Sequence, residues 1–365
     1  MTEGGISVTR TRPAHKAQPR SAADAHTRQV SQTPRRRRGS GTVSLVLGIV
    51  LLVIGLGVLL FPLALDVADR ARANDAIEEM RTTAIGDAAV TQVQGADGQT
   101  YRSKENDAAY DELVAYNAAV RAGTGDAIND PFAFQADELD SFDLPDGILG
   151  SVSIPKLGVK MTLYLGATTE NMEHGAAVIA GTSIPLGEQS SNTVIAAHRG
   201  GPYGHLRNIE DLEPGDQVIV ETPWDKLVYT VSSMEIILPT QTDAAGLGIE
   251  EGRDMVTLYT CHPYGVSSHR LLVHCDYDPN ATAEADPSPL AGAVLGFIPH
   301  NLSSDSPLLN AEAVLKLVAL VLLILCAALL IARAVRARRS RREERDMRAT
   351  VTRPPDLGAG GRHFR

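Results

Sequence analysis

Two long apolar runs divide this chain of 365 residues. They cover residues 42–65 and 313–332, and each has the roughly 20 apolar residues that a helix needs to cross the hydrocarbon core of a bilayer. Four arginines at 35–38 precede the first run, and six arginines between positions 333 and 342 follow the second. Because positive charge stays on the cytoplasmic side, this pattern predicts a two-span protein of the cell membrane, with both termini in the cytoplasm and residues 66–312 outside.

A cleaved signal peptide is the alternative for the first run. The apolar stretch is longer than the about 7–15 apolar residues of a signal peptide. The residues after it, Asp66-Val-Ala-Asp-Arg70, also lack a small-x-small cleavage site next to the apolar end. We therefore expect the first run to be retained as an anchor.

Charge follows the same division. The tails, residues 1–41 and 333–365, hold nine and eleven Lys or Arg residues against two and four acidic ones. The residues between them keep 14 of the 34 basic and 38 of the 44 acidic residues, a net charge of −24. This acidic region argues against nucleic-acid binding, because it has no basic excess to neutralise phosphates. Topology and contact with anionic lipid headgroups account for the basic tails.

Residues 66–122 are predicted to form a helical stalk. Helices are expected over 66–83 and 106–122, the second with Asn106 or Asp107 as its N-cap, because apolar residues recur there at helical spacing. The polar, glycine-containing segment 92–100 between them is expected to be a turn. The following residues, 123–147, are rich in Gly, Asp and Pro without periodicity, which predicts a long loop.

Residues 148–277 change to short β-branched runs separated by turn residues. Some eight strands at this spacing predict a mostly β fold, a closed or nearly closed eight-stranded barrel with one core. The runs are 147–154, 159–165, 176–180, 193–198, 217–221, 227–231 with 234–238, 255–261 and 270–277, and short helices are expected at 168–174 and 205–212. Residues 278–312 contain five prolines and are predicted to be a linker back to the membrane.

Cys261 is the best candidate for a reactive residue. It ends the apolar run Met255-Val-Thr-Leu-Tyr-Thr-Cys261, and Arg270 begins the next run nine residues later. A guanidinium beside a thiol favours the thiolate, which is the nucleophilic form. The other cysteines are Cys275 and Cys326, and Cys326 lies in the second apolar run, so at most one disulfide, between Cys261 and Cys275, could form outside the membrane.

Four motifs occur in order within residues 148–277. They are Asn192-Thr-Val-Ile-Ala-Ala-His198-Arg-Gly-Gly, Leu206-Arg-Asn-Ile-Glu-Asp-Leu-Glu-Pro-Gly-Asp216, Thr257-Leu-Tyr-Thr-Cys261 and Pro263-Tyr-Gly-Val-Ser-Ser-His-Arg270-Leu-Leu-Val. Together they resemble the sortase family of Gram-positive bacteria. Two positions depart from the family pattern: Ala196-Ala197-His198 stands in place of Thr-Gly-His, and His262 in place of Thr. Neither departure removes a catalytic group, but His262 adds a side chain that could bind or release a proton near the site.

The resemblance implies a sortase-type barrel and a cysteine transpeptidase without a cofactor. Such an enzyme cleaves a Leu-Pro-x-Thr-Gly sorting motif and holds the acyl fragment on cysteine before passing it to an amine. Cys261 would be the nucleophile, His198 the proton donor to the leaving amine, and Arg270 the partner of the acyl oxygen or the substrate backbone.

A subgroup is also indicated. Asp130-Pro131-Phe132 in the long loop, the Cys-x-Pro-Tyr-Gly continuation and the second apolar run resemble class C sortases, which assemble pili. In that case Phe132 would cover the thiol as part of a lid, Asp130 would accept hydrogen bonds from a basic group such as Arg270, and a pilin lysine would be the acceptor amine. An ordinary turn is the alternative for Asp130-Pro131-Phe132.

Other functions compete with this interpretation. The chain could be a sortase that anchors proteins to peptidoglycan, or a surface protein that is itself a sortase substrate, since its C-terminal apolar run and basic tail mimic a sorting signal. Residues 276–312 contain no Leu-Pro-x-Thr-Gly motif, and Leu238-Pro-Thr-Gln-Thr242 lies within the barrel pattern. A zinc site built from Cys261, Cys275 and three nearby histidines is disfavoured, because the ligand spacing of zinc sites is absent.

Overall fold

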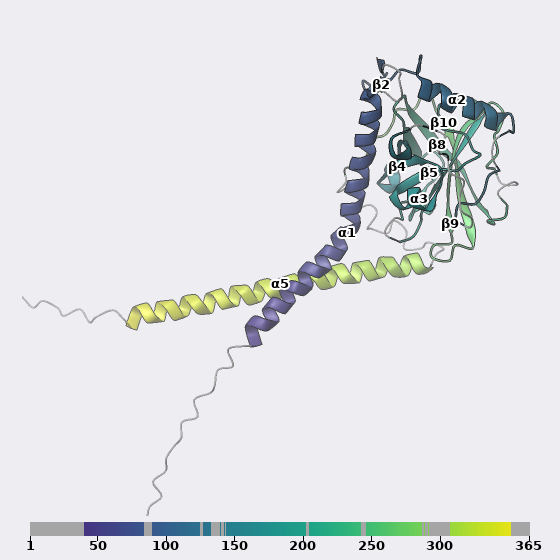
Figure 1. The fold of residues 1–365 in the computed structure, drawn as a ribbon. Helices are drawn as coiled ribbons and strands as arrows, with labels where there is room; N and C mark the ends of the chain where they lie inside the picture. Colours follow the sequence, from purple (N-terminus) through teal and green to yellow (C-terminus); the bar gives the residue numbers. More distant parts are fainter. Residues whose placement is uncertain are drawn as a thin grey trace, which may run out of the picture. The chain divides into compact units, whose positions relative to one another are not determined.

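The computed structural model describes residues 40–83, 90–124, 127–132, 139, 142, 144–201, 204–241, 246–286, 288, 291 and 307–351. Eight strands close into a barrel in the order β10-β8-β7-β3-β4-β5-β6-β9 (Figure 1). They are β3 (Ile148–Ile154), β4 (Val159–Leu165), β5 (Gly175–Val178), β6 (Ser191–Ala197), β7 (Gln217–Glu221), β8 (Lys226–Ile237), β9 (Asp254–His262) and β10 (His269–Tyr277). The predicted eight-stranded, mostly β barrel is confirmed.

Two parallel pairs distinguish this barrel from a simple meander. β4 pairs with β5 and β6 pairs with β9 in parallel, whereas the other neighbours are antiparallel. Parallel strands need a crossover connection. The short helix α3 (Thr169–His174) provides it between β4 and β5, and β7 and β8 lie between β6 and β9 in the chain. The second crossover brings the ends of β6 and β9 to the same rim of the barrel.

One predicted short helix is absent. Residues 168–174 form α3 with Thr168 as its N-cap, as expected, but residues 205–212 form turns that end in the single 3-10 turn η3 (Ile209–Asp211). Nucleating an α-helix is costly, and Pro214 and Gly215 follow too closely for the helix to extend. Burial of Leu206 and Ile209 fixes the segment instead.

The helices of the predicted stalk contact the barrel. α1 (Ser40–Thr82) places Arg70 Nη2 2.6 Å from the carbonyl oxygen of Gly158. α2 (Ala108–Arg121) begins at the N-cap Asp107, and its buried Asn117 donates to the carbonyl of Ile184 (3.0 Å) and accepts from the amide of the same residue (2.7 Å). The segment 92–100, predicted as a turn, instead forms most of a small hairpin of β1 (Gln92–Gln94) and β2 (Thr100–Arg102). The division of residues 66–277 into stalk, lid and catalytic domain stays a prediction.

The long C-terminal helix α5 (Pro307–Val351) is compatible with a membrane span. Its apolar part has a mean hydropathy of 3.1, and it exceeds the predicted run 313–332 at both ends. Within α1, the apolar stretch in the described residues is Val46–Val58, which is shorter than a bilayer crossing. The first span and the orientation of both termini therefore stay predictions. Of the basic tails, residues 1–39 and 352–365 lie outside the described residues, whereas residues 333–351 continue the helix α5.

Candidate active site

Cys261 and Arg270 face each other across adjacent strands. Cys261 is the second-last residue of β9, Arg270 the second residue of β10, and the antiparallel register pairs them directly. Paired residues in a sheet project from the same face at a Cα separation of about 5 Å. The guanidinium therefore lies on the same side of the sheet as the thiol, as the sequence predicted.

His198 reaches the same level on the other side of Cys261. The parallel pairing of β6 and β9 keeps a constant offset of 63 residues, from Ser191↔Asp254 to Ala196↔Tyr259. Two contacts show that the offset continues past the end of β6. Thr260 Oγ1 donates to the carbonyl oxygen of Ala197 (2.6 Å), and Arg199 Nη1 lies 3.1 Å from His262 Nδ1. His198 is consequently level with Cys261 on the neighbouring strand path, so the three predicted residues lie side by side.

Asp130 and Phe132, the residues predicted to form a lid, contact side chains of this row. Asp130 forms a forked ion pair with Arg270, with Nε to Oδ1 at 3.0 Å and Nη2 to Oδ2 at 2.7 Å. The Asp130 side chain is fully buried and that of Arg270 is 4% exposed. The predicted contact between the two residues is therefore present.

Phe132 lies among the side chains that flank Cys261. Its ring stacks on Tyr259 at a centroid distance of 6.1 Å and 4° between the planes, and it is 5.6 Å from the His198 ring. The guanidinium carbon of Arg270 is 5.4 Å from the same ring centroid. The Phe132 amide donates to Asp130 Oδ1 (3.1 Å), which makes Asp130-Pro131-Phe132 one local turn. Asp130-Pro131-Phe132 therefore forms the turn that was the alternative to a lid, and the same turn directs Asp130 and Phe132 towards the site.

The electrostatics of the site favour the neutral forms of Cys261 and His198. Burial raises the pKa of the Cys261 thiol, and the Asp130 carboxylate adds to that effect, whereas Arg270, the Ser267 hydroxyl and Arg199 act in the opposite direction. Burial likewise lowers the pKa of His198, although the charge of Glu173 opposes this. With Asp130 in place, a neutral thiol and a neutral imidazole are therefore the preferred forms.

Comparison with known proteins now identifies the fold. The sortase domain family matches residues 152–278. Residues 152–278 are a sortase domain. Sortase A of Bacillus anthracis is 25% identical over 130 residues, which cover 35% of this chain and 59% of that protein. Sortase SrtE2 of Streptomyces coelicolor is 29% identical over 100 residues, which cover 25% of this chain and 38% of that protein. The chain thus spans less than two thirds of the length of these curated relatives.

Solved structures of sortases are also similar to this chain. Sortase C1 of the GBS Pilus Island 1 is 32% identical with a TM-score of 0.44, and the match covers 48% of this chain and 89% of that one. Sortase C from Clostridium perfringens SM101 is 25% identical with a TM-score of 0.42, and the match covers 57% of this chain and 98% of that one.

The second thiol of the sortase domain cannot pair with the first. Cys275 pairs with Val256, whereas Cys261 pairs with Arg270, five residues before Cys275 on β10. At about 3.4 Å per residue the two cysteines are roughly 17 Å apart, and they project from opposite faces, so a disulfide would need large backbone movement. Among the described residues, no group of three or more histidine, cysteine or acidic side chains could hold a metal ion.

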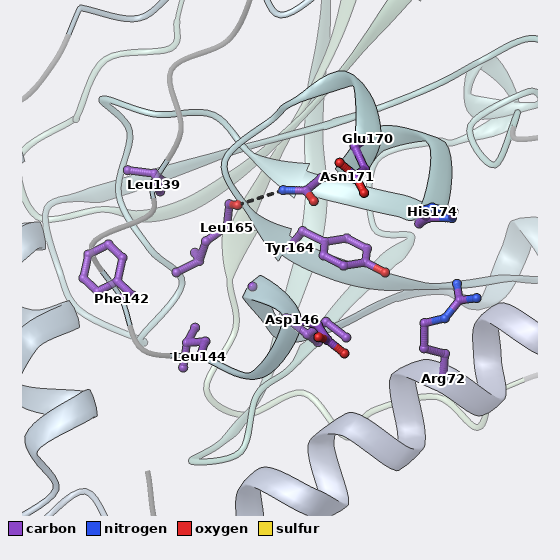
Figure 2. Close-up of a pocket in the computed structure, with 12 residues that line it drawn as sticks. Arg72, Leu139, Phe142, Leu144, Asp146, Tyr164, Leu165, Glu170, Asn171 and His174 are labelled. Atoms are coloured by element: carbon purple, nitrogen blue, oxygen red, sulfur yellow. Dashed lines mark hydrogen bonds between the residues drawn. The ribbon is translucent and has the colours of Figure 1, made fainter. Parts of the chain in front are cut away.

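A separate cavity of about 660 Å³ lies at the other end of the lid loop (Figure 2). Arg72 of α1, Asp146 and Phe142 of the loop, Tyr164 of β4 and Asn171 of α3 contribute to its lining. It includes none of the three predicted catalytic residues. Loop positions next to it, 140, 141 and 143, lie outside the described residues, and we assign the cavity no function.

Three functional neighbours were not singled out from the sequence. Tyr259 lies two residues before Cys261, so strand alternation alone places it on the same face, where it stacks on Phe132. Ser267 is in the β9–β10 loop and acts on the thiol through a side-chain hydrogen bond. Arg199 directly follows His198, but its partner Glu210 comes from η3, and no local sequence pattern predicts that contact.

Proposed function

We propose that this chain is a membrane-anchored cysteine transpeptidase that cleaves sorting motifs of the Leu-Pro-x-Thr-Gly type and transfers the acyl fragment to an amine. The observation that supports the proposal is the row of His198, Cys261 and Arg270 on three adjacent strand paths. A nucleophile between a proton carrier and a fixed cation is the arrangement that acyl transfer through a covalent intermediate requires.

The first half of the reaction makes a thioester. Cys261 gives its proton to His198, and the thiolate attacks the threonine carbonyl of the sorting motif. Arg270 faces the oxygen on which negative charge develops. The carbon–nitrogen bond breaks, the His198 imidazolium gives its proton to the leaving glycine amine, and the acyl fragment stays on Cys261.

The second half makes a new amide. An acceptor amine attacks the thioester carbonyl and loses a proton to His198. The carbon–sulfur bond breaks, and Cys261 leaves as a thiolate that recovers a proton from His198. No oxidant, reductant or metal is needed, and the enzyme returns to its starting protonation state.

We propose further that the acceptor is the lysine amine of a pilin subunit, as in class C sortases. The covering of the site by Asp130 and Phe132 supports this assignment. Asp130 occupies the guanidinium of Arg270 that the substrate would need, so the closed lid and the bound substrate exclude each other. Removing one partner of a buried ion pair costs about 3–5 kcal/mol, and a substrate has to offset a cost of this kind before it can bind productively.

The test is mass spectrometry of the full chain in detergent micelles after mixing with a Leu-Pro-x-Thr-Gly peptide. The wild type should gain the mass of the acyl fragment on Cys261, and Cys261→Ala should gain nothing. Cys275→Ala is the matched control, because that thiol lies on the opposite face and should leave the adduct unchanged. An adduct that persists in Cys261→Ala would refute the assignment.

The acceptor is tested separately by adding amines to the acylated enzyme. Release of acyl product onto a lysine-containing pilin peptide, in preference to a peptidoglycan cross-bridge amine, is the expected result. Preference for the peptidoglycan amine would favour the anchoring function instead.

A further inference from the structure

The residues that directly follow the two reacting residues meet on the far side of the sheet. Arg199 follows His198, and His262 follows Cys261. Because side chains alternate along a strand, this second pair projects away from the substrate side. Arg199 Nη1 lies 3.1 Å from His262 Nδ1, and the Arg199 side chain is only 1% exposed.

Glu210 completes this group, which we name the rim cluster: Arg199, Glu210 and His262. Glu210 belongs to η3 and places Oε2 2.8 Å from Arg199 Nη2 and Oε1 3.2 Å from His262 Nδ1. Arg199 Nε also donates to the carbonyl oxygen of Arg207 (3.4 Å). The rim cluster thus ties the end of β6, the end of β9 and η3 together directly behind the reacting pair.

His262 Nδ1 has two possible partners and can serve only one at a time. Without a proton it accepts a hydrogen bond from Arg199, whereas with a proton it donates one to Glu210. Either bond holds the imidazole between the guanidinium and the carboxylate. A threonine, the residue of the family pattern at this position, has no ring nitrogen to occupy that place.

We propose that His262 is a positioning residue for acyl transfer: within the rim cluster it fixes the ends of β6 and β9 so that His198 and Cys261 stay in reacting geometry, and it holds the Arg199 charge behind the thiol. This inference rests on the proposed transpeptidase function. It gives a role to the buried Arg199 and the partly buried Glu210 at the rim, where they add to the hydrogen bond from Thr260 Oγ1 to the carbonyl oxygen of Ala197. A displacement of about 1 Å between reacting groups can reduce a rate by ~100-fold, so the ties matter for chemistry.

The charge of Arg199 allows a measurement that a purely packing role of His262 would not affect, namely the pKa of Cys261. Burial raises the pKa of Cys261, and Arg199 is one of the groups that opposes this increase. Charged and titratable groups face the rim cluster and the thiol from several elements. They include Arg270 on β10, Tyr259 on β9, His198 after β6, Asp130, Tyr264 in the β9–β10 loop and Arg207 before η3. A change confined to His262 leaves all of them in place.

The experiment compares His262→Phe with His262→Asn in the full chain. Phenylalanine keeps the ring but has no acceptor, whereas asparagine carries an acceptor oxygen close to the position of Nδ1. His262→Phe should lower kcat for cleavage of the sorting peptide by at least ~10-fold with little change in KM, because the peptide binds on the other face. The pH midpoint of Cys261 alkylation should move upward, and His262→Asn should restore both values to within ~3-fold of the wild type.

His269→Phe is the matched control. His269 pairs with His262 in the β9–β10 register, but its ring contacts Ser268 at 2.9 Å. We expect wild-type kcat and a wild-type alkylation midpoint for this variant. Wild-type values for His262→Phe, or equal losses in His262→Phe and His262→Asn with an unchanged alkylation midpoint, would overturn the proposal and leave His262 a packing residue.

Glu210→Gln keeps the test decisive if His262→Phe does not fold. This variant removes the negative charge that faces Arg199, so the alkylation midpoint should move downward, opposite to the shift in His262→Phe. An unchanged midpoint in Glu210→Gln would also overturn the proposal. Alkylation needs no sorting peptide, so these variants report on the rim cluster even if the wild type cleaves no peptide, which would count against the transpeptidase function alone.

Discussion

We expect the reactivity of Cys261 to depend on the charges that lie near its thiol, above all on Asp130 and Arg270. In the closed site, burial and Asp130 raise the pKa of the thiol, and Arg270 cannot fully compensate because its guanidinium is paired with Asp130. Opening of the proposed lid would expose the thiol to water and separate Asp130 from it, so both causes of the pKa increase would weaken together. The ion pair between thiolate and imidazolium should therefore form mainly in the open state.

Neutralising Asp130 tests this dependence on charge. In Asp130→Asn the side chain keeps its size but loses the charge that raises the pKa of Cys261, so that pKa falls. A lower pKa means more thiolate at any pH below it, and the rate of alkylation by iodoacetamide should rise at neutral pH. Weaker pairing with Arg270 also opens the lid more often, which acts in the same direction. The measurement is the alkylation rate of the full chain as a function of pH.

The matched control for this prediction is Asp146→Asn. Asp146 lies at the other end of the lid loop, where it lines the cavity, and its backbone φ of 53° is one that asparagine tolerates. We expect its alkylation profile to match the wild type. Equal profiles for Asp130→Asn and the wild type would reduce Asp130-Pro131-Phe132 to an ordinary turn and remove the main support for the class C assignment.

Among the elements, α2 is fixed by its N-cap. Asp107 Oδ1 accepts from the amides of Ala109 and Tyr110, Oδ2 accepts from Trp224 Nε1 (3.0 Å), and both oxygens pair with Arg102, whose side chain is 1% exposed. Asp107→Ala removes the cap, worth about 1 kcal/mol, and leaves a buried arginine without its carboxylate, which costs about 3–5 kcal/mol.

Asp107→Ala should therefore lower the free energy of unfolding by at least ~3 kcal/mol, as measured by denaturant titration of the full chain in micelles. Asp111→Ala is the control on the same helix, because Asp111 is exposed in the first turn and its loss should cost less than ~1 kcal/mol. A loss below ~1 kcal/mol in Asp107→Ala would show that another group compensates for Arg102.

The strands were predictable because their signal is local. β4 and β7 match the predicted runs 159–165 and 217–221, since short runs of β-branched and other apolar residues with glycine or proline close by define them. The parallel pairing of β6 with β9 was not predictable in this way, because it joins segments 63 residues apart. This pairing places His198 beside Cys261, so His198 could be joined to Cys261 and Arg270 only through the family resemblance.

The contacts of the rim cluster were likewise not predictable from the local sequence. Glu210 lies in a segment that was expected to be a helix, and its role follows only from the fold that brings η3 under His262. The lid contact between Asp130 and Arg270 spans 140 residues, yet it could be expected, because the family resemblance paired an acid with a basic group. Spacing along the chain could not supply either contact.

For the whole molecule, the division of charge makes a topological prediction. The basic tails, residues 1–41 and 333–365, flank an acidic region with a net charge of −24. Moving a cluster of arginines across a bilayer is costly, and anionic headgroups attract such clusters on the cytoplasmic side. Both tails should stay inside, and the barrel should lie outside, where sorting motifs of secreted proteins are accessible.

Single cysteines can report this topology in intact cells. In a Cys261→Ala background, Cys275 is fully buried and Cys326 lies in the apolar part of α5, so neither should react with a membrane-impermeant maleimide. Ser288→Cys, in the linker after the barrel, should react in intact cells. Ser31→Cys and Thr352→Cys should react only after the membrane is permeabilised, because the arginines beside them hold both tails in the cytoplasm. Labelling of Thr352→Cys in intact cells would contradict the second span. Loss of the peptide that contains Ser31→Cys from the mature chain would show that residues 42–65 are a cleaved signal and that α5 alone anchors the enzyme.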